Sequence, residues 1–132
     1  MSESWVINAS PVILLAKAGL IKLVPSLAEN FVVPEPVVEE ILKVRGDAAA
    51  NWLNDAGKQF IRPAVRELEE LSGSEIGLGE RAVISWAAVN RGFVAVLDDR
   101  EARVIAQRLG VGVVGTVGVV LRLKKEIGRA HV

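Results

Sequence analysis

The sequence predicts an α/β fold built around a mainly parallel sheet. Strand-like and helix-like segments alternate along the chain, which is typical of strands joined by helical crossovers. No two strand-like runs are joined by the short turn of a hairpin, so antiparallel neighbours are not indicated. Hydrophobic residues make up 51% of the 132 residues, enough to fill one core, and we expect residues 1–132 to form a single domain.

The first half of the chain predicts two strand–helix units. Trp5–Ile7 forms a short apolar run, and Ser10 is expected to cap the helix that follows it. Pro11 suits the first turn of that helix, and Gly19 suits its left-handed end. The expected elements that follow are a short helix at 20–28, a strand at 31–33, a helix opened by Pro36, and a helix at 47–55 with Trp52 on its buried face.

The second half continues the alternation. The clearest strand is 93–97, where apolar residues follow Gly92 without interruption. The other expected elements are a short strand at 60–61 cut off by Pro63, a weak acidic helix at 67–71, a helix after Glu80, a helix with Ala102, Ile105, Ala106 and Leu109 on one face, a strand at 111–114, and a last helix capped by Thr116 with Val120, Leu121 and Ile127 facing inward.

Acidic and amide side chains fall where strands end or helices begin. Asn8 follows the first strand, and Asp98 and Asp99 follow strand 93–97. Glu40 lies on the helix after strand 31–33, and a glycine turn leads into Glu80. The carboxyl ends of parallel strands and the adjacent helix starts share one crevice of the sheet. Oxygen donors gathered there suggest a site for a hard cation.

Each acid also has a purely structural interpretation. One of Asp98 and Asp99 can cap the next helix, and Glu80 is stabilised at a helix start by the helix dipole. Glu39 and Glu40 are turned about 100° apart on their helix, so only one of them can face the crevice. The joint position of these acids after strands is what favours a metal site.

Composition excludes several kinds of site. The chain has no cysteine, and its one histidine, His131, lies beside the C-terminus, which excludes thiolate chemistry and argues against a histidine triad or zinc site. Net charge is zero, but residues 101–132 contain six Lys or Arg against two Glu. This basic end would suit a phosphate-bearing substrate, although a solvated helix face explains it equally well.

A glycine-rich segment, 110–115, matches the dinucleotide-binding pattern G-x-G-x-x-G. Its first glycine is expected to end a helix, and the expected strand lies inside the motif instead of before it. No acid follows at roughly twenty residues, where the ribose ligand would be needed. A nucleotide-binding regulator therefore has no support beyond these glycines.

The chain shows no pattern typical of membrane insertion or export. No apolar run reaches about 18 residues, and the N-terminus does not resemble a signal peptide. We therefore expect a cytoplasmic protein that does not bind a membrane. Its mean hydropathy of +0.36 leaves apolar surface to cover, which favours an oligomer.

Several segments resemble the PIN-domain family. Residues 6–13 resemble its opening motif, 33–41 its second motif, whose acid precedes an aliphatic residue, and 77–82 its third motif. Residues 97–103 followed by 115–118 resemble a PIN subfamily common in bacteria and archaea. The resemblance covers nearly the whole chain in order and spacing. Asn8 departs from it, because the family usually has Asp at that position.

The resemblance implies a three-layer α/β/α sandwich and a ribonuclease that depends on Mg²⁺ or Mn²⁺. Many members are toxins that pair with an antitoxin and form homodimers, so RNA, an antitoxin protein and a second copy are the expected partners. Because Asn8 offers a neutral oxygen in place of a carboxylate, it contributes less charge to a cation site. A catalytically inactive PIN-like binding or assembly module is therefore the alternative.

The resemblance also assigns roles to residues. Glu40 is favoured over Glu39 because it precedes Ile41, and Asp98 is favoured more weakly over Asp99 because it lies nearer the strand end. The expected catalytic and metal-binding acids are Glu40, Glu80, Asp98 and Asp99, with Asn8 completing the metal site. Ser10, Arg100 and Thr116 are the expected contacts to substrate.

Overall fold

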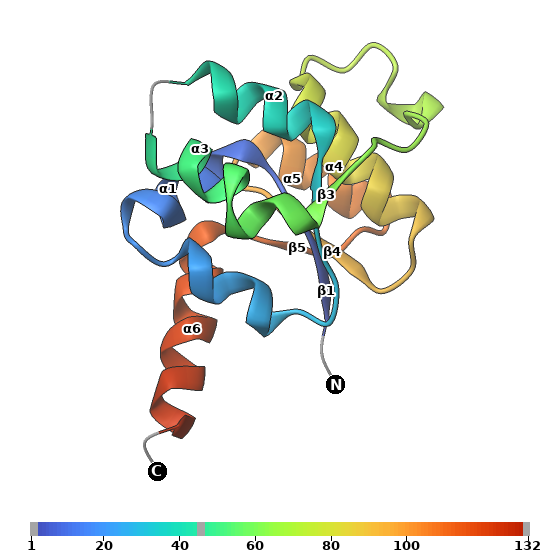
Figure 1. Ribbon diagram of the computed structural model, residues 1–132. Coiled ribbons are helices and arrows are strands. Elements are labelled where there is room, and N and C mark those ends of the chain that lie inside the picture. The colour runs from blue at the N-terminus through green and yellow to red at the C-terminus, as the bar shows by residue number, and fades with distance from the viewer. Residues whose placement is uncertain (1–2, 45–46, 131–132) are drawn as a thin grey trace.

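The computed structural model describes residues 3–44 and 47–130 and shows a five-stranded sheet with helices on both faces (Figure 1). All strand pairs are parallel, in the order β3-β2-β1-β4-β5. The strands are β1 (Ser4–Ile7), β2 (Phe31–Pro34), β3 (Ile61–Arg62), β4 (Phe93–Val96) and β5 (Val113–Val114). This arrangement confirms the predicted α/β/α sandwich with its parallel sheet.

The helices divide between the two faces of the sheet. Helices α1, α3 and α6 lie on one side, and α4 and α5 lie on the other (Figure 1). The helical segments are α1 (Ala9–Lys17), η1 (Ile21–Leu27), α2 (Glu35–Lys43), α3 (Asp47–Asn54), η2 (Ala56–Phe60), η3 (Glu69–Leu71), α4 (Leu78–Val89), α5 (Arg100–Arg108) and α6 (Thr116–Ala130). None of these described helices is long and apolar enough to cross a membrane.

Strand β1 forms the centre of the core. Its residues Trp5, Val6 and Ile7 are at most 1% exposed, although they point alternately to opposite faces. Both faces are covered because each crossover places a helix on the sheet, which explains why the strands are continuous apolar runs. The predicted burial of Trp52 on α3 is confirmed at 4% exposed.

The short helices expected at 20–28 and 67–71 are present, but they are not α-helices. Both contain 3₁₀ helix instead of α-helix, at η1 and η3. Pro25 lies inside η1, and its missing N–H and its ring disfavour the bonding of an α-helix. The acidic segment shortens to Glu69–Leu71, where only Leu71 is buried.

Two predicted helix caps are wrong. Helix α1 begins at Ala9 with Asn8 at the N-cap position, so Ser10 lies within the first turn and does not cap it. Thr116 is the first residue of α6, and its hydroxyl donates to Asp98. In both cases the chain becomes helical directly after the strand edge, earlier than the capping rule places it.

The predicted inward face of α6 is also wrong. Val120, Leu121 and Ile127 are 37%, 61% and 48% exposed, whereas Val119 and Leu123 are buried. The apolar residues of α6 form one broad arc, and only its Val119 and Leu123 side is buried where the helix contacts η1 and α1. Periodicity identifies the arc but cannot say which side of it the core covers, because that depends on distant elements.

Candidate metal site at the carboxyl edge of the sheet

The polar side chains gather where the strand order changes direction. The chain goes from β1 to β2 on one side of β1, and it later returns to β4 on the other side. Asn8 follows β1, and Asp98 follows Leu97 at the end of β4. Crevices at such switch points are the usual ligand sites of open parallel sheets.

Asn8 is fixed between the two central strands. Its backbone N–H donates to the carbonyl of Val96 at 3.1 Å, and the residue is only 5% exposed. The Oδ1 atom of Asn8 is buried and accepts no hydrogen bond from any described residue. A buried polar group without a partner costs about 1–3 kcal/mol, so this oxygen favours a ligand that can satisfy it.

Gly79 lets Glu40 approach Asn8 at the start of α4. The Gly79 N–H donates to Glu40 Oε1 at 3.0 Å. A Cβ on Gly79 would lie 2.7 Å from Glu40 Oε1, so that the carboxylate would have to move, and a tight 3.1 Å from Asn8 Oδ1. The absence of a side chain at residue 79 therefore makes room for both oxygens. Glu39 is exposed, so the helix turns Glu40 toward the crevice as expected.

Glu80 lies among other carboxylates at the first turn of α4. Its Oε1 accepts a hydrogen bond from the Gly77 N–H at 3.0 Å. Burial is the main cause that raises the pKa of Glu80, and the bond from Gly77 opposes it. The negative charges of Asp99, Glu40 and Glu101 raise this pKa further. The crevice therefore concentrates negative charge that a cation would neutralise.

The two adjacent aspartates have different partners. Asp98 accepts hydrogen bonds from the Thr116 N–H at 2.7 Å and from the Thr116 hydroxyl at 2.5 Å, so both of its carboxylate oxygens are engaged. Asp99 is exposed and caps α5 by accepting from the Ala102 N–H at 2.9 Å. The prediction that one of the pair caps the helix is thus confirmed, and it is Asp99.

The three expected substrate contacts lie in different surroundings. Ser10 is exposed in the first turn of α1. Arg100 lines an open hollow of about 610 Å³ along α5, together with Asp99, Glu101 and Arg108. Thr116 is occupied by Asp98. Only Arg100 therefore combines positive charge with a hollow beside the acids.

Two residues near this crevice were not expected from the sequence. Gly79 creates the space for Asn8 and Glu40, although the glycine turn had suggested only that it delivers Glu80. Arg103 reaches back to the end of β4, where its Nη1 donates to the carbonyl of Leu97 at 3.5 Å. Arg103 follows Asp99 by four residues, about one helical turn, and this spacing was a signal in the sequence. The direction in which its side chain points depends on packing.

The donor set fits a hard cation in type. Asn8, Glu40, Glu80 and Asp99 offer only oxygen, which Mg²⁺ and Mn²⁺ prefer, and the unsatisfied Oδ1 of Asn8 already lies in the crevice. Within residues 3–44 and 47–130, no three acidic or histidine side chains are grouped closely enough to form a metal cluster by themselves. His131 lies outside the described residues.

Fold and site together define an α/β protein with an acidic crevice at the switch point of a parallel sheet. A family model described as a PIN domain matches residues 4–128. The chain therefore belongs to the PIN-domain family, whose members generally use divalent metal ions. No curated protein matches the chain.

Proposed function

We propose that this PIN domain is a ribonuclease that depends on Mg²⁺ or Mn²⁺. The observation that carries the proposal is the buried, unsatisfied Oδ1 of Asn8, which shares the space over Gly79 with Glu40 Oε1. Glu80 and Asp99 add negative charge at the same edge of the sheet. This combination suits a divalent cation and a phosphate better than it suits a neutral ligand.

In this proposal the ion is held by Asn8, Glu40, Glu80 and Asp99. When bound, a divalent ion lowers the pKa of water and stabilises charge on the scissile phosphate. Arg100 and Arg108 line the hollow beside Asp99 and would attract the RNA backbone. The bonds from Thr116 hold Asp98 at the end of β4, so we assign Asp98 to positioning of this edge and Asp99 to the ion.

The proposal extends to partners. We propose a toxin whose activity is controlled by an antitoxin protein, and a homodimer as the assembled state. Its support is the resemblance of the motifs to the toxin-like PIN subfamily, together with large apolar side chains left in solvent. Leu78 and Leu42, for example, are 73% and 53% exposed. Surface of this kind is often covered in an assembly.

The neighbouring acids Glu39 and Glu40 provide a matched test of the active site. End-labelled single-stranded RNA is incubated with the purified chain in Mn²⁺, in Mg²⁺ and in excess EDTA. Cleavage should require metal, and Glu40→Gln should lower its rate roughly 10–100-fold, the scale of one charged interaction. The exposed Glu39→Gln should cut like the native chain. Equal loss in both variants, or full cleavage in EDTA, would contradict the proposal.

A catalytically inactive PIN-like binding module is the second candidate. It is favoured by one observation, the neutral amide of Asn8 in a site where the described acids form no ready cluster of three. Such a module would bind RNA in a filter-binding assay but leave it intact in both metals. Cleavage by the native chain, lost in Glu40→Gln, would exclude it.

A further inference from the structure

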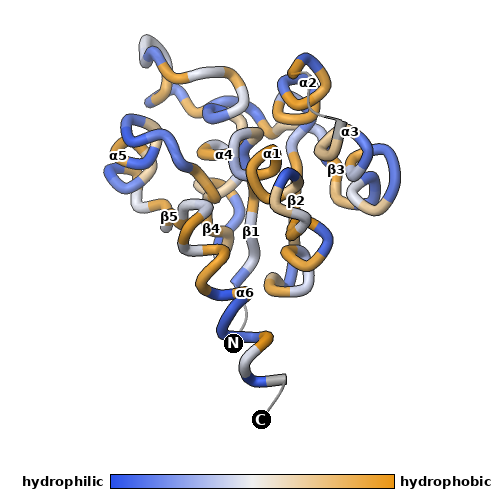
Figure 2. The backbone as a smooth tube through the Cα atoms, turned by 90° about the vertical axis from the view of Figure 1, so that its left-hand side faces the viewer, coloured by the Kyte–Doolittle hydropathy of each residue, from blue (hydrophilic) through white to orange (hydrophobic). Residues whose placement is uncertain are grey.

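Helix α6 extends beyond the rest of the molecule. Figures 1 and 2 show from two directions that its C-terminal part projects past the sheet and the other helices. Its inner face is short, because Val119 and Leu123 are the buried apolar residues that attach it to the core. Most of the helix surface is therefore available for other contacts.

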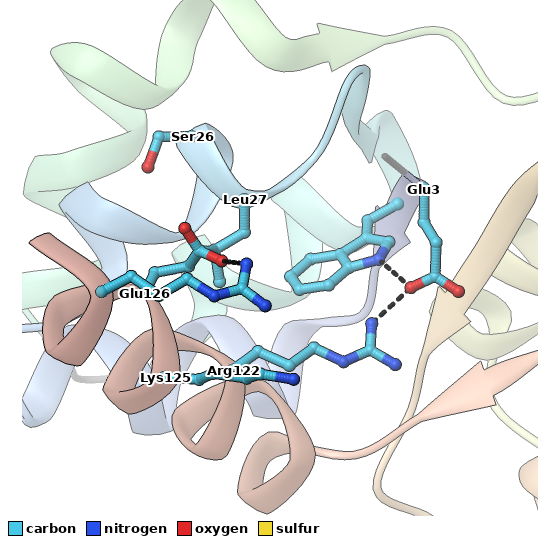
Figure 3. A pocket seen from close by; sticks show the side chains of 8 residues that line it. Glu3, Ser26, Leu27, Arg122, Lys125 and Glu126 are labelled. Carbon is cyan, nitrogen blue, oxygen red and sulfur yellow. Dashed lines mark hydrogen bonds and ion pairs between the residues drawn. The ribbon is translucent and has the colours of Figure 1, made fainter. Parts of the chain in front are cut away.

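A second face of α6 is held by polar contacts to the start of β1. The Arg122 guanidinium lies over the Trp5 ring, 5.5 Å from its centroid, and pairs with Glu3 (Figure 3). Arg129 pairs with Glu126 at 2.9 Å along the rim of the same hollow, whose volume is about 620 Å³. The charges of both arginines are thus compensated within the chain.

A third face carries an apolar stripe that no described residue covers. Val117, Val120, Leu121 and Ile127 are 75%, 37%, 61% and 48% exposed. Their spacing of three, four and seven residues places them on one side of the helix. At about 100° per residue, the centre of this side lies roughly 115° from the direction of Val119 and Leu123, and Val120 and Ile127 form the edge nearest to them. The stripe therefore begins beside the buried side and continues into solvent, where Val117 and Leu121 are its most exposed residues.

Charge distinguishes among the surfaces that could cover the stripe. Lys124 lies within it and Lys125 on its border, and neither forms an ion pair with a described residue. The helix carries four cations, Arg122, Lys124, Lys125 and Arg129, against the single acid Glu126. A second copy would bring like charges together, which is unfavourable in an interface. A lipid surface suits the stripe poorly, because a lysine interrupts it and it contains no aromatic anchor.

We propose that the stripe on α6, formed by Val117, Val120, Leu121 and Ile127, docks an acidic amphipathic helix of another protein. The stripe spans eleven residues, about 15 Å of helix, which matches about three turns of a partner lying along it. Apolar residues of the partner would cover Leu121 and Ile127, and flanking acids would meet Lys124 and Lys125. The proposal is independent of the ribonuclease site.

The test uses a synthetic peptide of about three heptads, with Leu at positions a and d and Glu at e and g. A twin peptide has Lys at e and g. The acidic peptide should bind the full chain in fluorescence anisotropy, more weakly at high salt, and the basic twin should not. Leu121→Ser and Ile127→Ser should each weaken binding by roughly tenfold. Val89→Ser, an equally exposed aliphatic residue on α4, is the matched control and should bind normally.

Several outcomes would overturn the proposal. The acidic peptide could fail to bind, or both peptides could bind equally. A native dimer that Leu121→Ser converts to a monomer in light scattering would show that a second copy covers the stripe. Sedimentation with phosphatidylglycerol vesicles that Leu121→Ser abolishes would show that a lipid surface covers it. RNA cleavage is measured on the same variants and should be unchanged. Failure of the docking proposal and failure of the nuclease proposal are therefore read from separate assays.

Discussion

Replacing Asn8 by Asp tests directly whether the buried oxygen belongs to a metal site. The substitution keeps the shape of the side chain and exchanges its amide for a carboxylate. Asn8 is 5% exposed, and its Oδ1 lies beside Glu40 Oε1 over Gly79. The variant therefore adds a further negative charge beside Glu40, in a crevice where burial and neighbouring acids already raise the pKa of Glu80. The substitution should therefore lower the stability of the fold when no cation is bound and strengthen the binding of a cation when one is present.

The expected magnitudes follow from this geometry. Without metal, a buried carboxylate next to Glu40 should lower the free energy of unfolding by about 1–3 kcal/mol, the cost of an unsatisfied buried group. For a chain of this size, that lowers Tm by roughly 3–10 °C. With Mn²⁺, the added charge should improve binding by a similar amount, which corresponds to about 10–100-fold tighter affinity. Saturating metal should then raise Tm more in the variant than in the native chain.

The assay is thermal unfolding of both proteins in EDTA and across a Mn²⁺ titration, with calorimetry for the affinity and RNA cleavage as a separate readout. Asn51→Asp, an exposed position on α3, adds the same charge away from the crevice and should show neither effect. The reasoning is refuted if Asn8→Asp leaves both the Tm in EDTA and the Mn²⁺ affinity unchanged. In that case Asn8 does not face the cation.

Two further substitutions examine the surroundings of this oxygen. Gly79→Ala places a Cβ 2.7 Å from Glu40 Oε1 and should weaken Mn²⁺ binding and RNA cleavage roughly tenfold or more. The control is Gly128→Ala, at a position where no described atom lies within 4 Å; it should bind metal normally and gain about 0.5–1 kcal/mol of helix stability. Equal metal affinity in the two variants would contradict the role of Gly79. Glu80→Gln should raise Tm at neutral pH in EDTA. The folded pKa of Glu80 is raised, chiefly by burial, so the fold binds this proton more tightly than the unfolded chain does, and stability is lost as pH rises through the folded pKa. The gain should therefore vanish below the ordinary pKa range of Glu, and a gain that persists in acid would show that charge is not its cause.

Much of the site could be predicted because its positions are local. Asn8, Asp98 and Asp99 follow buried strands, and in an all-parallel sheet every such position comes to the same edge. Glu80 belongs to this group because a glycine turn starts α4 there. The choice of Glu40 over Glu39 came from the family motif, and it agrees with the exposure of Glu39.

The partners of these groups could not be predicted. Asp98 is engaged by Thr116, 18 residues away, and Glu40 by the N–H of Gly79, 39 residues away. Such contacts depend on how helices settle on the sheet within a few ångströms, which the order of residues does not encode locally. The sequence had favoured Asp98 as the metal ligand. We propose Asp99 instead, because both oxygens of Asp98 accept hydrogen bonds from Thr116 and because the charge of Asp99 acts on Glu80.

Local sequence patterns were enough to predict the parallel α/β architecture and the edge at which the polar residues gather, because alternation of strands and helices and the spacing of apolar residues are properties of short segments. The close approach of Asn8 and Glu40 across Gly79, and the face of α6 that remains in solvent, depend instead on how distant elements pack together. The physical reason is the same in both cases. A helix with a broad apolar arc, or an edge with several acids, has more than one locally acceptable orientation, and packing against distant elements selects one of them.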